Sequence, residues 1–548
     1  MLLISFDTSP KLYFLVGVLA AFMMLAWEAW QHKKQAKPAY EAVFLLSAAF
    51  LLVFMRLPTV LYNQEINIDE SQVISHALTL KQYPTYWESV DGTTIGPLNI
   101  YLLIVPTWFG LAFDYTAAHL LNICCQLGFL LFFFLSIRNF YGVQIARLAL
   151  LPTLFFFAFT QESDFVHYSS EQLPILMLGA CLWLFSKIYN APQNNQFGVW
   201  YALGLVAGAV PFAKLQAVPL AGLMVLFAVI WLVVFSKKYL REKLTIGAVL
   251  LMAGLTFPLL VFGWALANNL FDDMLDFYIR GNLVYAGGRS FWQSMAAIPA
   301  FFSKIKGFQY YWLATLGLAV LAVVVSKKKW SKENGFLLIF ACCQLFISVY
   351  AATKTGNDFG HYLLLCVVPL AFLNAWLLHQ IGSFNLFTYL SIGALVVFGA
   401  FNLLKFNANN YPTTRQLPQT EVTKAIQKYG KVGEYLTVWG WACRYYVETQ
   451  MPEGTAENHS ERCIFDHPMR HDYRKRYLAD LRRTRPVVFA DAVGKNSTWV
   501  QNKATQGHES FPELKTFIAQ HYTYAGTTDD VRIYVRNDRF AQPINTNK

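Results

Sequence analysis

Long apolar runs constrain the fold of this chain more than any other feature of its 548 residues. Most of them are about 17–25 residues long, the length that crosses a bilayer as an α-helix. Only 14% of the residues are charged, whereas soluble proteins average about 25%. We therefore expect a polytopic α-helical membrane protein. About twelve spans are predicted, at residues 11–30, 40–61, 115–137, 143–160, 171–189, 199–213, 217–235, 244–268, 308–326, 335–352, 361–379 and 386–404.

The loops between these spans predict their orientation, because cytoplasmic loops are rich in lysine and arginine. Four loops are basic, around residues 33–37, 138–147, 237–243 and 327–332. All four can be cytoplasmic only if the apolar segment 97–112 does not cross the bilayer, so we expect it to be an interfacial helix. The long loops 62–114 and 269–307, and everything after residue 404, then lie outside the cytoplasm.

The composition becomes polar and mixed from Lys405 onward, which predicts two domains. Residues 1–404 would form the transmembrane domain, and residues 405–548 a small extracytoplasmic α/β domain. A segment of about 140 residues is long enough for its own core. We expect helices at 418–429, 470–484 and 511–520, strands at 434–439 and 486–490, and a β-hairpin of 522–526 with 531–536.

The net charge of +11 follows largely from the basic loops and does not predict nucleic-acid binding. The segment 470–485 of the outer domain is also basic. It is either a solvated helix face or a contact for anionic headgroups or an anionic acceptor.

Cys443 and Cys463 are the two cysteines outside the predicted spans. A disulfide between them and two free thiols are both open alternatives, because oxidation is possible outside the cytoplasm.

An acidic pair, Asp69 and Glu70, follows the second span in the stretch Asn67-Ile68-Asp69-Glu70-Ser71. A charged group close to lipid is costly and needs a reason to be there. One interpretation is the start of an interfacial helix, where Asp and Glu are favoured. The other is a general base on the outer face.

The segments around this pair resemble those of the C-type (GT-C) membrane glycosyltransferases, in particular protein O-mannosyltransferases and lipid A aminoarabinose transferases. In these families an acidic pair and a short helix follow a span. A Pro-Pro-Leu-Tyr-like interfacial helix and a span with an Ala-Arg-Leu-like start come next. This chain has Gly96-Pro97-Leu98 and Ala117-Ala118-His119-Leu120, so Gly96 replaces a proline and His119 replaces the arginine. The resemblance covers roughly the first 220 residues at motif level.

The resemblance implies an inverting glycosyltransferase that moves a sugar from a polyprenyl-phosphate donor to an acceptor on the outer face of the membrane. Asp69 would deprotonate the acceptor, and Glu70 would orient Asp69 or bind a sugar hydroxyl. The expected partners are the lipid-linked donor, a glycan, lipid or protein acceptor, and membrane lipids, but no nucleic acid. The expected location is a bacterial inner membrane.

The outer turn after residue 160 matches the family's Tyr-Ser-x-Glu-like segment at Tyr168, Ser169 and Glu171. Three further ionisable groups lie in the same turn, Glu162, Asp164 and His167. The turn is either a solvated loop or a site where an acid holds the donor sugar or a divalent ion. Carboxylates would suit magnesium or manganese, and whether a metal is used stays open.

Three cations at outer positions are candidates for contact with the donor phosphate, namely Lys214, Arg280 and Arg289. A lysine suits phosphate as a point charge, and an arginine can bind it with two hydrogen bonds. The alternative is simple anchoring in the outer leaflet. His361-Tyr362 stands where the family often has Arg-Tyr, so these two residues and His119 are further candidates.

Two other functions stay open. A lipid or solute transporter would need broken helices and polar groups near the bilayer midplane, whereas the ionisable residues here gather at the outer ends of spans. A non-catalytic membrane scaffold is the other alternative, because histidine replaces the family's arginine at two places.

Overall fold

The computed structural model describes residues 7–31, 38–193, 196–326, 331–382, 393 and 416–540. The chain divides into two compact units. The first, which we call the helical unit, comprises Met1–Leu61, His119–Trp264 and Ala286–Thr413. The second, which we call the mixed unit, comprises Tyr62–Ala118, Ala265–Tyr285 and Thr414–Lys548.

Nine helices in the described part of the chain are long and apolar enough to cross a membrane, which makes this a multi-pass membrane protein. Two further predicted spans, 143–160 and 199–213, are shorter apolar helices. The predicted span 386–404 lies outside the described residues, apart from residue 393. The helices at these positions are α1 (Pro10–Gln31), α2 (Pro38–Leu61), α6 (Tyr115–Tyr141), α7 (Val143–Phe159), α9 (Gln172–Asn190), α10 (Phe197–Ala209), α11 (Val218–Phe235), α12 (Leu240–Ala267), α16 (Lys306–Val325), α17 (Lys332–Thr353) and α18 (Leu364–Ile381).

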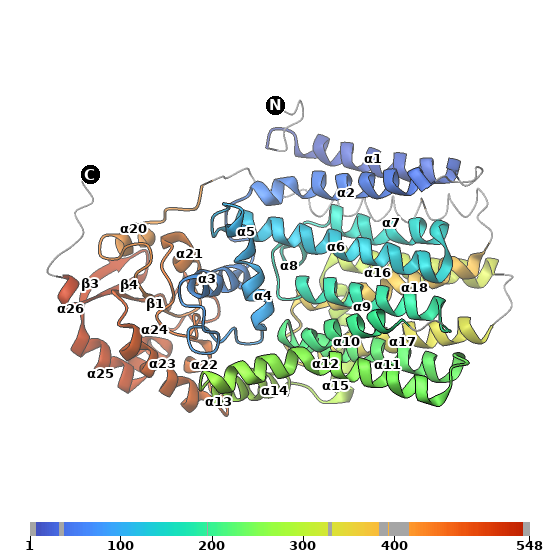
Figure 1. Cartoon of the computed structure of the whole chain (residues 1–548). Coiled ribbons are helices and arrows are strands. Elements are labelled where there is room, and N and C mark those ends of the chain that lie inside the picture. The colour runs from blue at the N-terminus through green and yellow to red at the C-terminus, as the bar shows by residue number, and fades with distance from the viewer. Residues whose placement is uncertain are drawn as a thin grey trace. The chain divides into compact units, whose positions relative to one another are not determined.

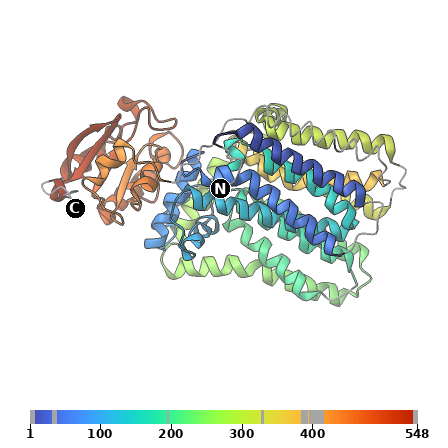
Figure 2. The ribbon, with the colours of Figure 1, turned by 90° about the horizontal axis from the view of Figure 1, so that it is seen from above.

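The core of the helical unit forms around α18, which packs against α7, α9, α16 and α17. Nearly every residue of α18 is buried, as expected for a helix that is apolar on all sides. The N-terminal helix α1 lies along α2 (Figure 2). The amphipathic helix α15 (Phe291–Lys304) packs against α16 and α17.

A buried ion pair joins α1 to α7 within the helical unit. Arg147 donates from Nε to the carboxylate of Glu28 at 2.8 Å, and the Tyr40 hydroxyl donates to the same carboxylate at 2.9 Å. The sequence predicted that Arg147 flanks a basic loop, and it does lie near the start of α7, but its side chain is buried. A buried charge is tolerated at such a place because it is paired and hydrogen-bonded.

The segment 97–112 forms two short helices, α4 (Pro97–Leu102) and α5 (Val105–Trp108), instead of one interfacial helix. Pro97 and Pro106 stand at the helix starts, where the missing N–H of proline is tolerated. A bilayer crossing needs about 20 helical residues, so neither helix can span. Trp108 and Phe109 are exposed at the end of α5.

The mixed unit contains a four-stranded sheet in the order β1-β2-β4-β3. β1 (Leu436–Trp439) pairs in parallel with β2 (Val488–Asp491), and β4 (Val531–Arg536) is antiparallel to both β2 and β3 (Tyr522–Thr528). The predicted hairpin is confirmed, but its loop is shorter than expected. Asp529 and Asp530, with φ of 44° and 70°, make the turn, because these values match the twist of a two-residue hairpin loop.

Helices cover both faces of this sheet (Figure 1). Val488 and Ala490 of β2 pack on the side of α20 (Glu421–Gln427) and α21 (Arg444–Thr449). Phe489 packs on the side of α23 (Arg470–Thr484) and α25 (Pro512–His521). The helices predicted at 418–429, 470–484 and 511–520 are thus α20, α23 and α25. The remaining short helices of the mixed unit include α13 (Phe271–Asp273), the π-helix Met274–Arg280, α14 (Gly281–Tyr285), α22 (Glu461–Ile464), α24 (Lys503–Gln506) and α26 (Asn537–Phe540).

The first outer loop is part of the mixed unit, and its helix α3 (Ile68–Gln82) is held there by buried polar contacts. His76 Nδ1 lies 2.8 Å from Glu453, and Asn458 donates to Glu453 at 2.8 Å and to Ser75 Oγ at 2.8 Å. Val73, Ile74, Ala77 and Leu80 of α3 are buried as well, so apolar and polar contacts hold the helix together. The predicted domain boundary at 404–405 lies among residues outside the described ones.

Cys443 and Cys463 are both free thiols, so the disulfide alternative is wrong. Cys443 donates to the carbonyl of Asn458 at 3.6 Å, and Cys463 to the carboxylate of Glu457 at 3.0 Å. Burial raises the pKa of each thiol well above the ordinary value for cysteine.

Candidate functional site

The acidic pair lies in the first turn of α3, in the mixed unit. Asn67 is the N-cap, because its side chain accepts from the backbone N–H of Asp69 at 3.1 Å. Glu70 is buried and accepts from the N–H of Ile66 at 3.2 Å. Asn67 and Glu70 therefore supply the local hydrogen bonds that begin the helix. The half-buried carboxylate of Asp69 is not the capping group.

Lys214 is the centre of a buried polar cluster in the helical unit. It stands in extended conformation between the 3₁₀ turns η1 (Val210–Phe212) and η2 (Leu215–Ala217) and is only 2% exposed. Its ammonium donates to Ser170 Oγ at 2.5 Å and to the carboxylate of Glu171. The ammonium also lies 4.9 Å from the ring centroid of Tyr362. We call Ser170, Glu171, Lys214, His361 and Tyr362 the Lys214 cluster.

Glu171 is the anionic member of the Lys214 cluster and is fully buried. Burial alone would raise the pKa of its carboxyl, but the attraction of Lys214, assisted by His361, lowers it to about 2. Glu171 is therefore ionised at neutral pH and accepts the hydrogen bond of Lys214 as a carboxylate.

His361 and Asp164 extend this cluster. His361 and Tyr362 lie in the 3₁₀ turn η4 (Gly360–Leu363) at the start of α18, and His361 Nδ1 is 3.6 Å from Asp164 Oδ1. Burial opposes ionisation of Asp164, but the neighbouring His361 keeps the pKa of its carboxyl below the ordinary value. His167 lies beside His361, with 5.8 Å between the ring centroids, and its Nδ1 is 2.6 Å from the carbonyl of Ser163.

The other residues of this predicted turn and its surroundings are mostly buried. Glu162 is half-buried at the start of α8 (Ser163–Val166), and burial raises the pKa of its carboxyl, helped by Asp164. Tyr168 is fully buried. His119 is also buried, near the start of α6. The turn is thus a packed polar assembly within the helical unit, not a solvated loop.

The two arginine candidates have different surroundings. Arg289 makes two hydrogen bonds to the carboxylate of Asp358, at 2.5 and 2.7 Å, and donates to the carbonyl of Thr353 at 3.2 Å. In the mixed unit Arg280 ends the π-helix and is largely exposed, 3.6 Å from Asp276 and 3.9 Å from Asp472. Of the three predicted cations, Lys214 alone is buried in its unit.

A pocket of about 340 Å³ opens in the mixed unit next to the first turn of α3. We call it the two-tryptophan pocket. Its lining includes Glu65, Ser71, Trp441, Arg444, Asn496 and Trp499. Burial raises the pKa of Glu65 to about 7, against the opposing effects of a hydrogen bond from Ser71 and of Arg444.

These pocket residues were not singled out in the sequence. A usable signal was present, because Gly440-Trp441 follows a predicted strand directly. Side chains after parallel strands gather at one edge of a sheet. Ser170 was likewise not assigned a role.

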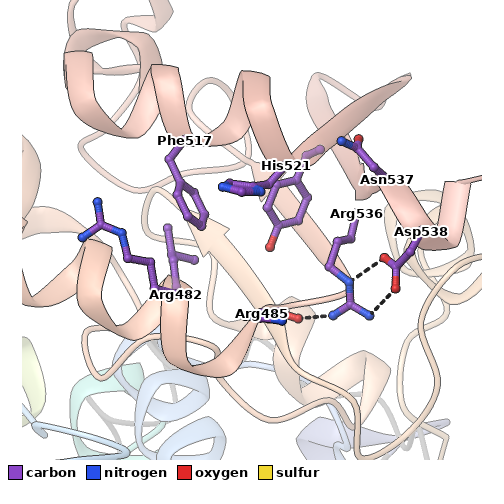
Figure 3. Close-up of a pocket in the computed structure, with 9 residues that line it drawn as sticks. Arg482, Arg485, Phe517, His521, Arg536, Asn537 and Asp538 are labelled. Carbon is purple, nitrogen blue, oxygen red and sulfur yellow. Dashed lines mark hydrogen bonds and ion pairs between the residues drawn. The ribbon is translucent and has the colours of Figure 1, made fainter.

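A second hollow of about 680 Å³ lies at the opposite edge of the sheet, between the end of α23 and the strands β3 and β4 (Figure 3). Arg482 and Arg485 of the basic segment line it, together with Phe517, His521 and Arg536. Arg536 binds Asp538 at 2.7 Å and also donates to the carbonyl of Arg485 (Figure 3). Its charge is therefore already balanced within the fold.

Asp491, His508 and Glu509 offer ligand atoms within 4.8 Å of one another, the spacing of a metal site. Arg532, however, donates to Glu509 at 2.6 Å and to Asp491 at 2.5 Å. A guanidinium that already occupies both carboxylates does not fit a bound cation, and the group is better described as an ion-pair network.

Comparisons with known proteins support the fold. No family model matches this sequence, and no curated protein is similar to it in sequence. ArnT from Cupriavidus metallidurans bound to undecaprenyl phosphate is similar in structure, with a TM-score of 0.58 and 12% identity over 91% of this chain and 98% of that chain. An oligosaccharyltransferase from Archaeoglobus fulgidus in complex with zinc and sulfate gives 0.44 and 11% identity over 82% and 68%, which is too low for an assignment.

At this level of identity the likeness to ArnT concerns the fold alone. It agrees with the resemblance drawn from the motifs around Asp69: the chain has the fold of ArnT.

Proposed function

We propose that this protein is an inverting glycosyltransferase that moves a sugar from a polyprenyl-phosphate donor to an acceptor hydroxyl or amine on the outer face of the membrane. The observation that carries the proposal is the buried ammonium of Lys214, in a chain with the fold of ArnT, whose structure contains undecaprenyl phosphate. An ammonium has three N–H donors, and Ser170 and Glu171 accept two of them. The third N–H can donate to an anionic oxygen of the donor phosphate.

The reaction needs one base and one cation. The acceptor oxygen or nitrogen bonds to the anomeric carbon, and the bond from that carbon to the phosphate oxygen breaks, with its electron pair leaving on the phosphate. Asp69 takes the acceptor's proton, as a general base does. Lys214 neutralises the charge that develops on the departing phosphate. Glu171 is a positioning residue, because its bond to Lys214 fixes the ammonium.

The experiment is a transfer assay on the full-length protein in nanodiscs. It is given a panel of undecaprenyl-phosphate sugars with membrane extract as acceptor, and release of undecaprenyl phosphate is measured. We expect release by the wild type and a large loss of kcat with Lys214→Met. The matched control is Lys187→Met, a lysine of α9 that lies 4.2 Å from the ring centroid of Trp183, and it should behave as the wild type. Equal turnover in both variants would remove Lys214 from the mechanism.

The same assay separates the two alternatives. A transporter would move labelled lipid across a liposome membrane without releasing undecaprenyl phosphate. A scaffold would do neither. The basic loops support an extracytoplasmic mixed unit, and the short loops support a bacterial inner membrane.

A divalent metal is a further proposal for the helical unit. His167 and His361, whose ring centroids are 5.8 Å apart, would supply two imidazoles, ligands that suit zinc or manganese better than magnesium. Chelation by EDTA should then abolish sugar transfer. Addition of one divalent ion, from a series that includes zinc, manganese and magnesium, should restore it. Full activity after metal removal would leave these residues with a purely polar role.

A further inference from the structure

The two-tryptophan pocket lies at the carboxyl edge of the parallel strands β1 and β2. The segments that follow these strands, 440–444 and 492–501, supply most of its walls. In open α/β sheets, ligands bind in the crevice outside the carboxyl ends of parallel strands. The pocket volume of about 340 Å³ is within the range of small-molecule sites.

Trp441 and Trp499 form an aromatic corner of this pocket. Their ring centroids are 5.3 Å apart and the rings are nearly perpendicular, at 84°. Trp441 is 7% exposed and Trp499 50% exposed. The indole of Trp499 therefore offers an apolar surface on a segment that is otherwise polar.

Trp499 is held in a backbone conformation that tryptophan rarely adopts, with φ of 62°. The loop around it is fixed by three hydrogen bonds. The N–H of Trp441 donates to Ser497 Oγ at 2.7 Å, the N–H of Thr498 to the carbonyl of Trp441 at 3.2 Å, and the N–H of Gly494 to the carbonyl of Val500 at 3.1 Å. Strain that is maintained by its surroundings is typical of ligand-binding positions.

Hydrogen-bonding groups surround the aromatic corner. Arg444 donates to Asn496 Oδ1 at 3.0 Å, which fixes both side chains at the wall. Trp441 Nε1 and Arg444 Nε are buried donors without an acceptor among the described residues. A buried donor left without a partner is costly, and a ligand oxygen would remove that cost.

The charges of the pocket are balanced. Arg444 lies near two carboxyl groups, those of Glu65 and Glu448, and Lys495 binds Asp529 at 2.5 Å. This favours a neutral polar ligand over a phosphate or another polyanion.

We propose that the two-tryptophan pocket binds one sugar unit of a glycan acceptor. The apolar face of a pyranose ring would stack on Trp499, and its hydroxyls would accept from Trp441 and Arg444 and bond to Asn496. The pocket also adjoins the proposed base, because Glu65, Ile68 and Ser71 line it and Asp69 lies between them in the chain. That the sugar belongs to an acceptor rests on the proposed function, but binding of the sugar does not.

The test uses the full-length protein in nanodiscs on an array of bacterial surface oligosaccharides without lipid. The first variant is Trp499→Gly, because glycine adopts a positive φ without strain. The second is Asn496→Ala. The control is Tyr524→Ala, which removes an aromatic ring with 52% exposure from strand β3 of the same unit.

The wild type and the Tyr524→Ala variant should bind the same oligosaccharides. Both pocket variants should bind them at least roughly tenfold more weakly, the effect expected for losing a main contact of a binding site. Trp499→Gly should melt at the same or a higher temperature than the wild type, which a purely structural tryptophan would not allow. Wild-type binding of no oligosaccharide, or equal binding by the pocket variants, would overturn the proposal.

A Lys214→Met variant separates this inference from the proposed function. It should bind oligosaccharides like the wild type while it fails to transfer sugar. If Lys214→Met loses sugar transfer but still binds oligosaccharides, the pocket assignment is supported independently of the proposed mechanism. Oligosaccharide binding that Lys214→Met abolishes would contradict the assignment to this pocket.

Discussion

Lys214 donates a hydrogen bond to the carboxylate of Glu171, and both side chains are buried although the two residues are 43 positions apart in the sequence. Breaking such a pair by removing one partner leaves an uncompensated buried charge, which costs about 3–5 kcal/mol. The pair therefore links stability to the proposed chemistry, and the two effects can be separated by mutation.

The first prediction uses this separation. Lys214→Met and Glu171→Gln should each lower the melting temperature markedly, because each leaves the other group charged and buried. The double variant removes both charges and should melt close to the wild type. It should nevertheless remain inactive, because the cation is gone. Melting curves and the release of undecaprenyl phosphate provide the two measurements, and activity in the stable double variant would contradict the role of Lys214.

The second prediction concerns pH. The pKa of the Glu171 carboxyl is about 2 in the folded protein, and about 4.5 is ordinary for a glutamate. The folded state thus binds fewer protons than the unfolded state between these values, so the stabilisation is complete above pH 4.5 and is lost as the pH falls towards 2. It amounts to about 3 kcal/mol. The gap in melting temperature between the wild type and Glu171→Gln should narrow over this window and stay constant from pH 5 to 8.

The third prediction tests whether Asp69 acts as a general base or only helps to begin helix α3. Asp69→Asn keeps the size of the side chain but cannot take a proton, and should reduce turnover by roughly 10²–10⁴-fold with little effect on the melting temperature. Asn67→Ala removes the N-cap of α3 and should cost about 1 kcal/mol of stability while turnover changes little. Glu70→Gln should cost less activity than Asp69→Asn. The opposite pattern, with activity retained in Asp69→Asn, would favour the helix-start interpretation.

The sequence predicted the elements of this fold well where apolar residues alone determine them. Runs of apolar residues located the helices, and the alternation along 531–536 located strand β4. Helix α3 shows where this reasoning stops. Its buried polar contacts join His76 to Glu453 and Asn458, which lie almost four hundred residues further along the chain. No local pattern encodes such a contact.

The candidate site was likewise only partly predictable. The motifs pointed to Glu171, Lys214 and His361 separately, and the fold brings them into one cluster. Arg289 shows the converse, because no motif predicted that Asp358 would pair with it. The two-tryptophan pocket depends on the parallel pairing of β1 and β2, which residue periodicity does not reveal.

The fourth prediction follows from the free thiols of the mixed unit. Cys443 and Cys463 are buried and donate to different acceptors, Asn458 and Glu457. Protein purified without reductant should therefore have the intact mass of two reduced cysteines, and dithiothreitol should not change its melting temperature. Maleimide should label these thiols only after unfolding, because burial keeps them both protonated and inaccessible. A mass lower by two hydrogens would show that they do pair.

The fifth prediction concerns orientation. A cysteine at position 331, an exposed N-cap of α17, should be shielded from a membrane-impermeant maleimide in intact cells, because the basic loop before it is expected in the cytoplasm. Ser89 is buried in the mixed unit, whereas the neighbouring Glu88 is exposed, so Glu88→Cys is the better reporter for the first outer loop. It should react from outside, and Ser331→Cys should react only after the membrane is permeabilised. The unmodified protein is the control for labelling of Cys124 and Cys342, which are exposed in the structure. The reverse pattern would place Asp69 on the cytoplasmic side, and an acceptor on the outer face would then be out of its reach.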